Sequence, residues 1–308
     1  MTSPQTQSQP LLAVLWMMGA LASFTSMAVA ARELTQDLSV FQISFMRTVI
    51  CLSLLMPYAY RLGWQEMKTA RLKTHIGRNI IHFGGQFGWI FGVSVLPLAA
   101  VFSLEFSAPV WTAILAAIFL KEKLTRIRVI SIALGFAGIL VILRPGSDLM
   151  QPAAFVVIGA AVCFACTYVF TRGLAATESA FKIIFYMNLI QLPIGLVLSV
   201  PVWVTPDVEM IPFIAILGIG GITSHYSIAR AMAHADAAVV SPLDFLRLPL
   251  VAVIGFMLYQ EPWNPYVLIG GAITFSGNLL NIWSEQKALR KSPVPPLQAT
   301  ETAHERRT

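Results

Sequence analysis

The stretch Ala99-Ala100-Val101-Phe102-Ser103-Leu104-Glu105-Phe106 decides the fold, because it returns 139 residues later as Ala238-Val239-Val240-Ser241-Pro242-Leu243-Asp244-Phe245. A second pair of segments, Ser39–Phe45 and Ser179–Phe185, matches at an offset of 140. Each copy holds five hydrophobic segments, an odd number, so the second copy must enter a bilayer from the opposite side. Such inverted repeats are typical of carriers that expose one central site to each side of a membrane in turn. The repeat therefore predicts transport.

The composition indicates a membrane protein. Hydrophobic residues make up 56% of the chain and charged residues 12%, whereas soluble domains carry about 25% charged residues. A bilayer core requires about 20 apolar residues per spanning helix. We expect an all-α integral membrane protein whose ten transmembrane helices form two inverted five-helix repeats: Leu11–Ala31, Ser39–Tyr60, Ile76–Val95, Leu98–Leu120, Ile127–Leu143, Pro152–Leu174, Phe181–Val200, Ile211–Met232, Ala237–Tyr259 and Pro265–Ser284.

These helices divide the chain into two repeats with a polar segment at each end. The repeats are expected over residues 11–143 and 152–284. Residues 1–10 and 285–308 are expected to be disordered cytoplasmic segments, because they lack apolar periodicity.

The positive charges predict the orientation. Seventeen of the 21 Lys and Arg residues fall on the side that holds both chain ends, and only Arg32 and Arg144 fall on the other side. The remaining two, Arg47 and Arg247, lie inside predicted helices. Because cytoplasmic loops collect Lys and Arg, we expect both termini in the cytoplasm of a protein of the cytoplasmic (inner) membrane. The basic residues are expected to meet lipid headgroups rather than nucleic acid.

Two stretches after the fourth helix carry a resemblance to a known family. Leu120-Lys121-Glu122-Lys123-Leu124-Thr125 follows a Pro-containing helix and precedes Gly135-Phe136-Ala137-Gly138. With ten helices in two related halves, residues 10–285 resemble the EamA-type transporters of the drug/metabolite transporter superfamily. The second half departs from the pattern at Tyr259-Gln260-Glu261-Pro262-Trp263. The resemblance implies a central cavity among helices 1–4 and 6–9, with helices 5 and 10 outside.

Ionisable side chains inside membrane helices are costly, which makes each a candidate for function. Arg47 and Glu105 lie at similar depths, roughly 12 Å and 10 Å from the same end of their helices at 1.5 Å per residue. Their opposite charges predict an ion pair that either contributes to a substrate site or only locks helices 2 and 4.

Helix 9 carries a second charged pair. Asp244 and Arg247 are three residues apart and therefore share a face. Arg247 lies near the middle of its helix, where a guanidinium can bind a carboxylate or phosphate through two hydrogen bonds. Asp244 is either a proton-coupling group or the permanent counter-ion of Arg247. His225 of helix 8, at about the depth of Asp244, is either a proton relay or a structural histidine.

Helix 3 presents His82, Gln86, Trp89 and Val93 along one helical face. A polar and aromatic face on a membrane helix contacts protein or water rather than lipid. His82, Gln86 and Trp89 are therefore candidate substrate contacts beside Arg47 and Arg247, while Glu105, Asp244 and His225 are candidates for charge pairing or proton coupling. In the repeat Gln86 matches His225, and Glu105 matches Asp244.

Other motifs favour packing. Gly270, Gly271, Thr274 and Gly277 form a small-residue face on helix 10, which suits close helix packing or a homodimer through helices 5 and 10. We expect no catalytic residues, metal site or cofactor, because the chain lacks the motifs of ATPases, zinc proteases and serine hydrolases.

Two functions remain open at this stage. The first is a secondary active transporter of a small polar or amphipathic metabolite, with amino acids or other carboxylate-bearing solutes favoured. The second is an intramembrane enzyme that acts on a lipid-linked substrate. The inverted repeat and the charges in both halves favour the carrier, while purine-type metabolites, riboflavin and amphipathic toxins also stay open as substrates.

Overall fold

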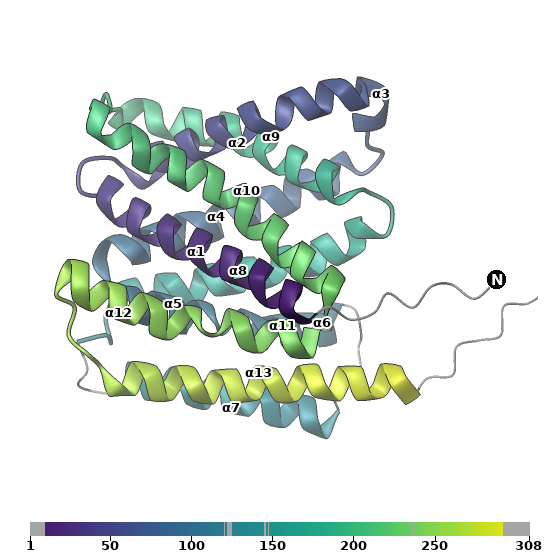
Figure 1. The fold of residues 1–308 in the computed structure, drawn as a ribbon, viewed down its shortest axis with the longest axis vertical. Coiled ribbons are helices and arrows are strands. Elements are labelled where there is room, and N and C mark those ends of the chain that lie inside the picture. The colour runs from purple at the N-terminus through teal and green to yellow at the C-terminus, as the bar shows by residue number, and fades with distance from the viewer. Residues whose placement is uncertain are drawn as a thin grey trace, which may run out of the picture.

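The computed structural model describes residues 10–119, 121, 125–144, 146, 148–235 and 237–291, and within these residues all regular structure is helical. Figure 1 shows the helices lying side by side in one bundle. They are α1 (Pro10–Leu34), α2 (Val40–Leu62), α3 (Trp64–Met67), α4 (Leu72–Val95), α5 (Leu98–Glu105), α6 (Ala108–Phe119), α7 (Arg126–Leu143), α8 (Pro152–Ala175), α9 (Ala180–Ser199), α10 (Ile211–His234), α11 (Ala237–Asp244), α12 (Arg247–Tyr259) and α13 (Pro265–Lys291), with 3-10 turns at Val200–Val202 and Val208–Met210.

The helices have the length and composition of membrane spans. In the described part of the chain, nine are long and apolar enough to cross a bilayer, counting α5 with α6 as one. The tenth, α4, is as long as the others at 24 residues but begins with a polar segment that includes Lys73, His75 and Arg78. It packs beside α8 and α9 in the bundle. The predicted fold class is therefore confirmed.

Matching serines begin matching helices of the two repeats. Ser39 precedes α2 and accepts a hydrogen bond from the backbone N–H of Gln42 at 3.2 Å, while Ser179 precedes α9 and accepts one from Lys182 at 3.2 Å. A serine hydroxyl at this position satisfies one of the free N–H groups of the first turn. The matched segments Ser39–Phe45 and Ser179–Phe185 thus begin the corresponding helix in each repeat.

The strongest helix contacts all join one repeat to the other. α1 packs on α10, α2 on α9, α4 on α8, α5 on α12 and α7 on α13. An approximate two-fold relation between the repeats maps α1 onto α8 and α4 onto α10, so it exchanges the α1–α10 contact with the α4–α8 contact. Taken span by span, it maps each of the other three contacts onto itself. Neither repeat buries its own apolar faces alone, so the two repeats fold as one unit.

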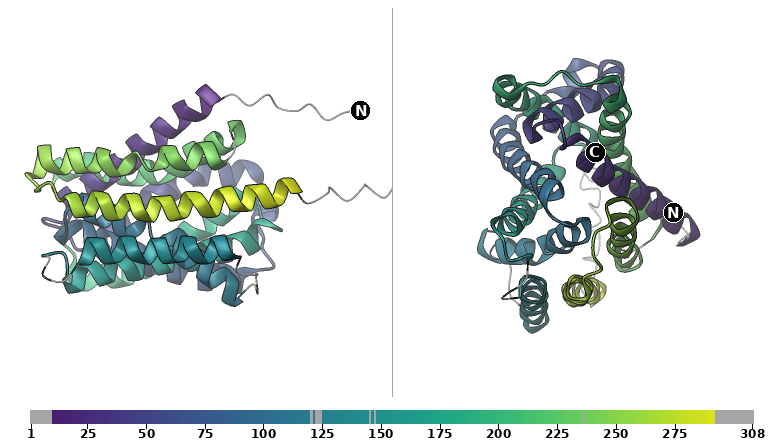
Figure 2. Two further views of the ribbon diagram at one scale, coloured as in Figure 1. Left: turned by 90° about the horizontal axis from the view of Figure 1, so that it is seen from below. Right: turned by 90° about the vertical axis from the view of Figure 1, so that its left-hand side faces the viewer.

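Helices α7 and α13 lie together at one edge of the bundle (Figures 1 and 2). They approach so closely that a Cβ at Gly138 would overlap Thr274 and the carbonyl oxygen of Gly270. Gly277 likewise faces the Ser131 carbonyl of α7. Most of the small-residue face of α13 is thus occupied by contacts within one chain.

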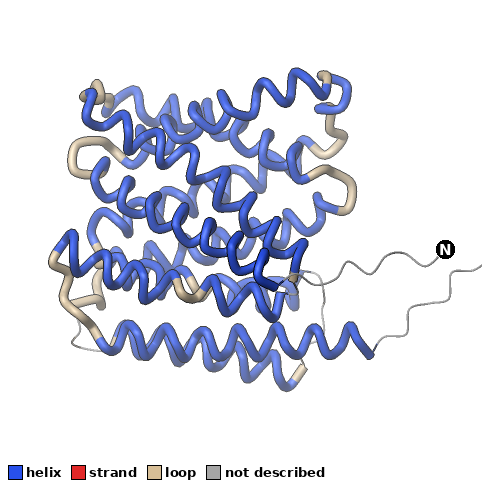
Figure 3. The backbone as a smooth tube through the Cα atoms, in the orientation of Figure 1, coloured by secondary structure: helices blue, strands red, loops and turns tan. Residues whose placement is uncertain are grey.

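Four features differ from expectation. The fourth and ninth spans are each interrupted rather than continuous, and Figure 3 shows the loop between α11 and α12. Pro109 and Pro249 have no N–H to bond the carbonyl groups of Glu105 and Phe245, four residues earlier, which favours a break at each point. In addition, α13 continues to Lys291 through residues expected in the disordered tail, and the short α3 lies in an expected loop.

Candidate functional site

The two interrupted helices bring their acidic residues together. α5 ends at Glu105 and α11 ends at Asp244, and the next residues, Phe106 and Phe245, stack with ring centroids 4.5 Å apart. Glu105 lies within electrostatic range of both Asp244 and Arg247. Discontinuous helices that meet in this way form the binding sites of many carriers. The repeat therefore assembles a charged centre from both halves of the chain.

Arg247, the first residue of α12, is paired and enclosed. Its Nη2 lies 3.3 Å from Oδ2 of Asp244, an ion pair across the interruption between α11 and α12. The guanidinium also packs over three phenylalanine rings, at 4.3 Å from the centroid of Phe24, 4.8 Å from Phe106 and 5.1 Å from Phe102. Cation–π contacts with desolvated rings stabilise a buried guanidinium. Arg247 thus has both a counter-ion and an aromatic cage.

Arg47 does not pair with Glu105, so that expectation is wrong. The Nη2 of Arg47 donates to Oε1 of Gln86 and to Oε1 of Gln191, the latter at 3.4 Å. Glu105 instead accepts a hydrogen bond from Nε1 of Trp89 at 2.8 Å. The physical reason is that α4 contacts both α2 and α5, and its polar side chains lie between the two charges.

The polar face of α4 contacts protein, as the sequence predicts. His82 Nδ1 lies 2.8 Å from Nε2 of Gln191, Gln86 binds Arg47, Trp89 binds Glu105, and Val93 is fully buried. This face therefore connects Arg47 of α2 and Gln191 of α9 with Glu105 of α5.

Two exposed side chains, on α8 and α10, lie within electrostatic range of the charged centre. Tyr168 of α8 is 58% exposed and still lies within electrostatic range of Glu105 and Arg247. His225 of α10 is also exposed, contacts Phe24 with ring centroids 6.1 Å apart, and lies within range of Arg247.

The sequence reasoning missed two residues of this centre. Arg78, expected among the cytoplasmic charges, is 7% exposed and donates from Nε to Oγ1 of Thr171 at 2.7 Å. Gln191 is fully buried between Arg47 and His82. Arg78 precedes His82 by four residues and so extends the polar face of α4 by one turn. That spacing is the signal that could have identified it.

We call the end of the bundle where α1 begins and α13 ends the proximal end, and the opposite end the distal end. At the distal end, Arg32 of α1 donates to Glu261 at 3.1 Å and to the carbonyl oxygen of Leu96 at 2.5 Å. Glu261 also accepts the backbone N–H of Leu98 at 2.8 Å. Burial raises the pKa of Glu261 although Leu98 and Arg32 act in the opposite direction. These contacts join α1, the α4–α5 turn and the end of α12, and we call them the distal latch.

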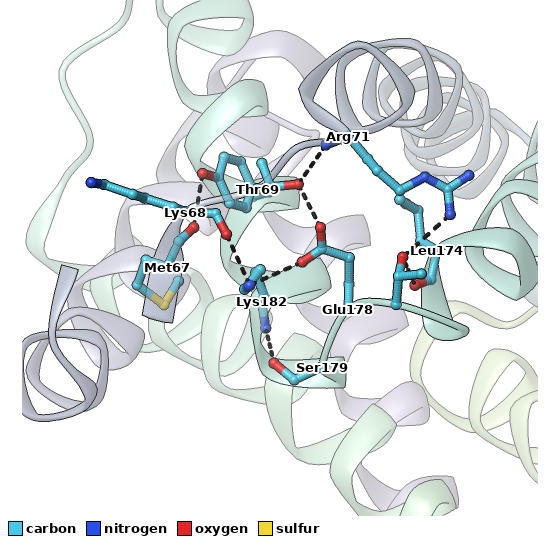
Figure 4. Close-up of polar contacts among 10 residues, drawn as sticks. Met67, Lys68, Thr69, Arg71, Leu174, Glu178, Ser179 and Lys182 are labelled. Atoms are coloured by element: carbon cyan, nitrogen blue, oxygen red, sulfur yellow. Dashed lines mark hydrogen bonds and ion pairs between the residues drawn. The ribbon is translucent and has the colours of Figure 1, made fainter. Parts of the chain in front are cut away.

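At the proximal end, a polar cluster joins the segment before α4 to the turn between α8 and α9 (Figure 4). Glu178 accepts the hydroxyl of Thr69 at 2.5 Å and pairs with Lys182 at 3.1 Å. Lys182 also donates to the carbonyl oxygen of Lys68 at 3.0 Å. Burial alone would raise the pKa of Glu178, but Thr69 and Lys182 together lower it below the ordinary value.

A pocket of about 130 Å³ adjoins the charged centre. Asp244, Phe106 and Phe245 line it, and Asn278 lies among its otherwise apolar walls from α1, α10, α11 and α13. It lies in the proximal half of these helices, whereas the distal latch connects helix ends on the other side. Within the described ranges, no three His, Cys, Asp or Glu side chains gather as metal ligands would.

Comparison with known proteins places this architecture. The EamA-like transporter family matches residues 11–144 and again residues 151–283. An S-adenosylmethionine uptake transporter of Rickettsia bellii is 27% identical over 276 residues, which are 90% of this chain and 95% of that protein. A riboflavin transporter of Brucella anthropi is 30% identical over 241 residues, 75% of this chain and 85% of that protein. A crystal structure with 15% identity has the same fold, with a TM-score of 0.60 over 90% of this chain and 98% of the other. The chain is a multi-pass membrane protein that belongs to the EamA-like transporter family.

Proposed function

We propose that this protein is a secondary active transporter that moves a small metabolite across the cytoplasmic membrane by alternating access. The observation that carries the proposal is the charged centre at the two helix interruptions, where Glu105, Asp244 and Arg247 meet. Ionisable groups inside membrane spans cost free energy, so their presence indicates a functional site. The named relatives, which carry S-adenosylmethionine and riboflavin, support a metabolite as the cargo.

The geometry favours transport over chemistry. An enzyme that acts on a lipid-linked substrate would gather its acids and histidines near one membrane interface. Here the ionisable groups lie at breaks in the middle of two spans, from both repeats, with a closed latch at one end. We therefore infer that the protein is not an enzyme and that its partners are the lipid bilayer and a small-molecule substrate, with a solute that bears a carboxylate favoured.

The site residues divide into two groups. We propose Arg47, Gln86, Trp89, His82 and Arg247 as the substrate-facing wall, and Asp244, Glu105 and His225 as the groups that balance charge or accept a coupling proton. Arg47 and Arg247 come from opposite repeats, so a solute between them would contact both halves of the protein. Alternating access requires this arrangement, because the halves must move about a fixed site.

We propose that the proximal end faces the cytoplasm, with both chain ends on that side. The excess of Lys and Arg at this end supports the assignment. The structure then has its distal latch closed toward the outside. If two copies associate, the outer faces of α7 and α13 are the proposed contact, because exposed Leu140 and Ile269 remain there after the two helices have packed on each other.

The test is solute flux in proteoliposomes that contain the purified protein. Radiolabelled S-adenosylmethionine, riboflavin and amino acids are offered, and the solute recovered inside is checked for chemical identity. We expect uptake of an unchanged solute, a loss of more than ten-fold in Arg247→Gln, a smaller loss in Arg247→Lys, and full activity in the surface control Glu209→Gln. A chemically altered product, or uptake equal to that of empty liposomes for the whole panel, would contradict the proposal.

A further inference from the structure

Arg47 is a buried cation whose partners are all neutral. Arg47 is 7% exposed, and its guanidinium donates hydrogen bonds to the amide oxygens of Gln86 and Gln191. The acidic group within electrostatic range is the thiol of Cys51, and no carboxylate among the described residues forms an ion pair with Arg47. Arginine stays protonated in proteins, so a full positive charge is buried there without a counter-ion.

Arg247 provides the internal comparison. It is similarly buried, at 4% exposed, but Asp244 neutralises it and Glu105 lies within electrostatic range. Desolvating an ion costs several kcal/mol unless an opposite charge compensates. The positive charge of Arg247 is thus neutralised by a carboxylate of the protein, whereas the positive charge of Arg47 is not.

Two donors beside the Arg47 charge are also unused. Nε of Arg47 and Nε2 of Gln86 are buried without a hydrogen-bond partner in the described structure. These side chains are bonded to each other, so the two donors belong to one cluster. A carboxylate accepts two parallel hydrogen bonds and brings the missing negative charge.

The surroundings favour a singly charged group. Trp89, three residues after Gln86 and therefore about 4.5 Å further along α4, holds the carboxylate of Glu105. A dianionic phosphate would be repelled more strongly by this neighbour than a carboxylate would be. Gly221 of α10 adds room on the other side, because a Cβ there would approach Nη1 of Arg47 to 3.2 Å.

We propose that Arg47, Gln86 and Gln191 form the anion subsite of the transported solute and that this subsite takes a carboxylate group. The proposal rests on the proposed function, since it names the chemical class that the carrier would accept. It assigns the anionic group of the solute to Arg47, whose charge no carboxylate of the described residues neutralises.

The first test uses probes that do not depend on the identity of the natural solute. Thermal unfolding of the purified full-length protein is measured with acetate and with acetamide, its neutral counterpart, at constant ionic strength. A ligand that binds only the folded state raises its stability with concentration. We expect acetate to stabilise the wild-type protein more than acetamide does. The acetate dissociation constant should rise at least ten-fold in Arg47→Gln and stay within two-fold in the surface control Arg230→Gln.

A second probe pair extends the test to a solute of realistic size. S-adenosylmethionine and its decarboxylated form differ in one carboxylate, and wild-type protein should prefer the former while Arg47→Gln binds the two equally. Arg47→Lys keeps the charge but not the fork, so it should fold even if the glutamine variant does not, and should retain part of the preference.

Equal effects of the members of both pairs on the wild-type protein would overturn the subsite, as would a carboxylate preference that survives in folded Arg47→Gln. If either result were found while Arg47→Gln still took up neutral riboflavin at the wild-type rate, the subsite proposal would fail and the transporter proposal would stand. Absence of any flux in the wild-type protein would instead count against the proposed function.

Discussion

The distal latch predicts how easily the protein opens at its distal end. Replacing Glu261 by glutamine keeps the shape of the side chain but removes the charge that holds Arg32, at 3.1 Å. The two side chains are 17% and 11% exposed, so the pair lies between exposed pairs, worth about 0.2–1 kcal/mol, and buried pairs, whose disruption costs about 3–5 kcal/mol.

The intermediate exposure of the two side chains places the net value between these two classes. We take about 2 kcal/mol, which corresponds to roughly a 30-fold change in an equilibrium constant at about 1.4 kcal/mol per factor of ten. Glu261→Gln should therefore raise the population of distally open molecules by about that factor.

The assay measures access to a position behind the latch. Ala30 of α1 is fully buried, and a cysteine placed there, in a background without the native cysteines, can react with a membrane-impermeant maleimide only when the distal end opens. We expect the labelling rate from the distal side to rise about 30-fold in Glu261→Gln. The matched control Glu209→Gln, at an exposed acid before α10, should leave the rate unchanged.

A double variant checks the reasoning. Arg32→Gln combined with Glu261→Gln leaves no unpaired charge, so its labelling rate should rise less than the two single effects combined. An unchanged rate in folded Glu261→Gln, or fully additive effects in the double variant, would refute the role of this ion pair as a latch.

Three further predictions concern orientation, packing and pH. Single cysteines at Lys68 and Asp207 should react with impermeant thiol reagents only from the cytoplasm and only from outside, respectively; the reverse result would invert the proposed orientation. Gly138→Ala should destabilise the protein by about 1–3 kcal/mol through overpacking in thermal unfolding, while Gly159→Ala, where a new Cβ meets nothing within 4 Å, should change stability by less than about 0.5 kcal/mol. The pKa of Glu178 is lowered in the folded protein. Its contribution to stability is therefore present above the unfolded pKa of about 4.3 and is lost as the pH falls through the folded pKa. Glu178→Gln should flatten this acid dependence of stability, and an identical acid profile in the variant would contradict the assignment.

The sequence by itself determined the architecture. Hydrophobic segments of bilayer length report helices directly, and the repeat of residues 99–106 at residues 238–245 required an inverted second half. Periodicity also identified the inward face of α4 through His82, Gln86 and Trp89. These features are readable because each depends on spacing along one helix, which the regular geometry of the α-helix converts into position.

Only the tertiary structure decided which charges meet. The sequence placed Arg47 and Glu105 at equal depth, but depth says nothing about rotation about the helix axis or about a third helix in between. The structure places Gln86 beside Arg47, Trp89 beside Glu105, and Arg247 within reach of both acids. Contacts between residues 16 to 144 positions apart depend on how helices pack across the repeats, because side chains on neighbouring helices meet only at particular rotations and crossings.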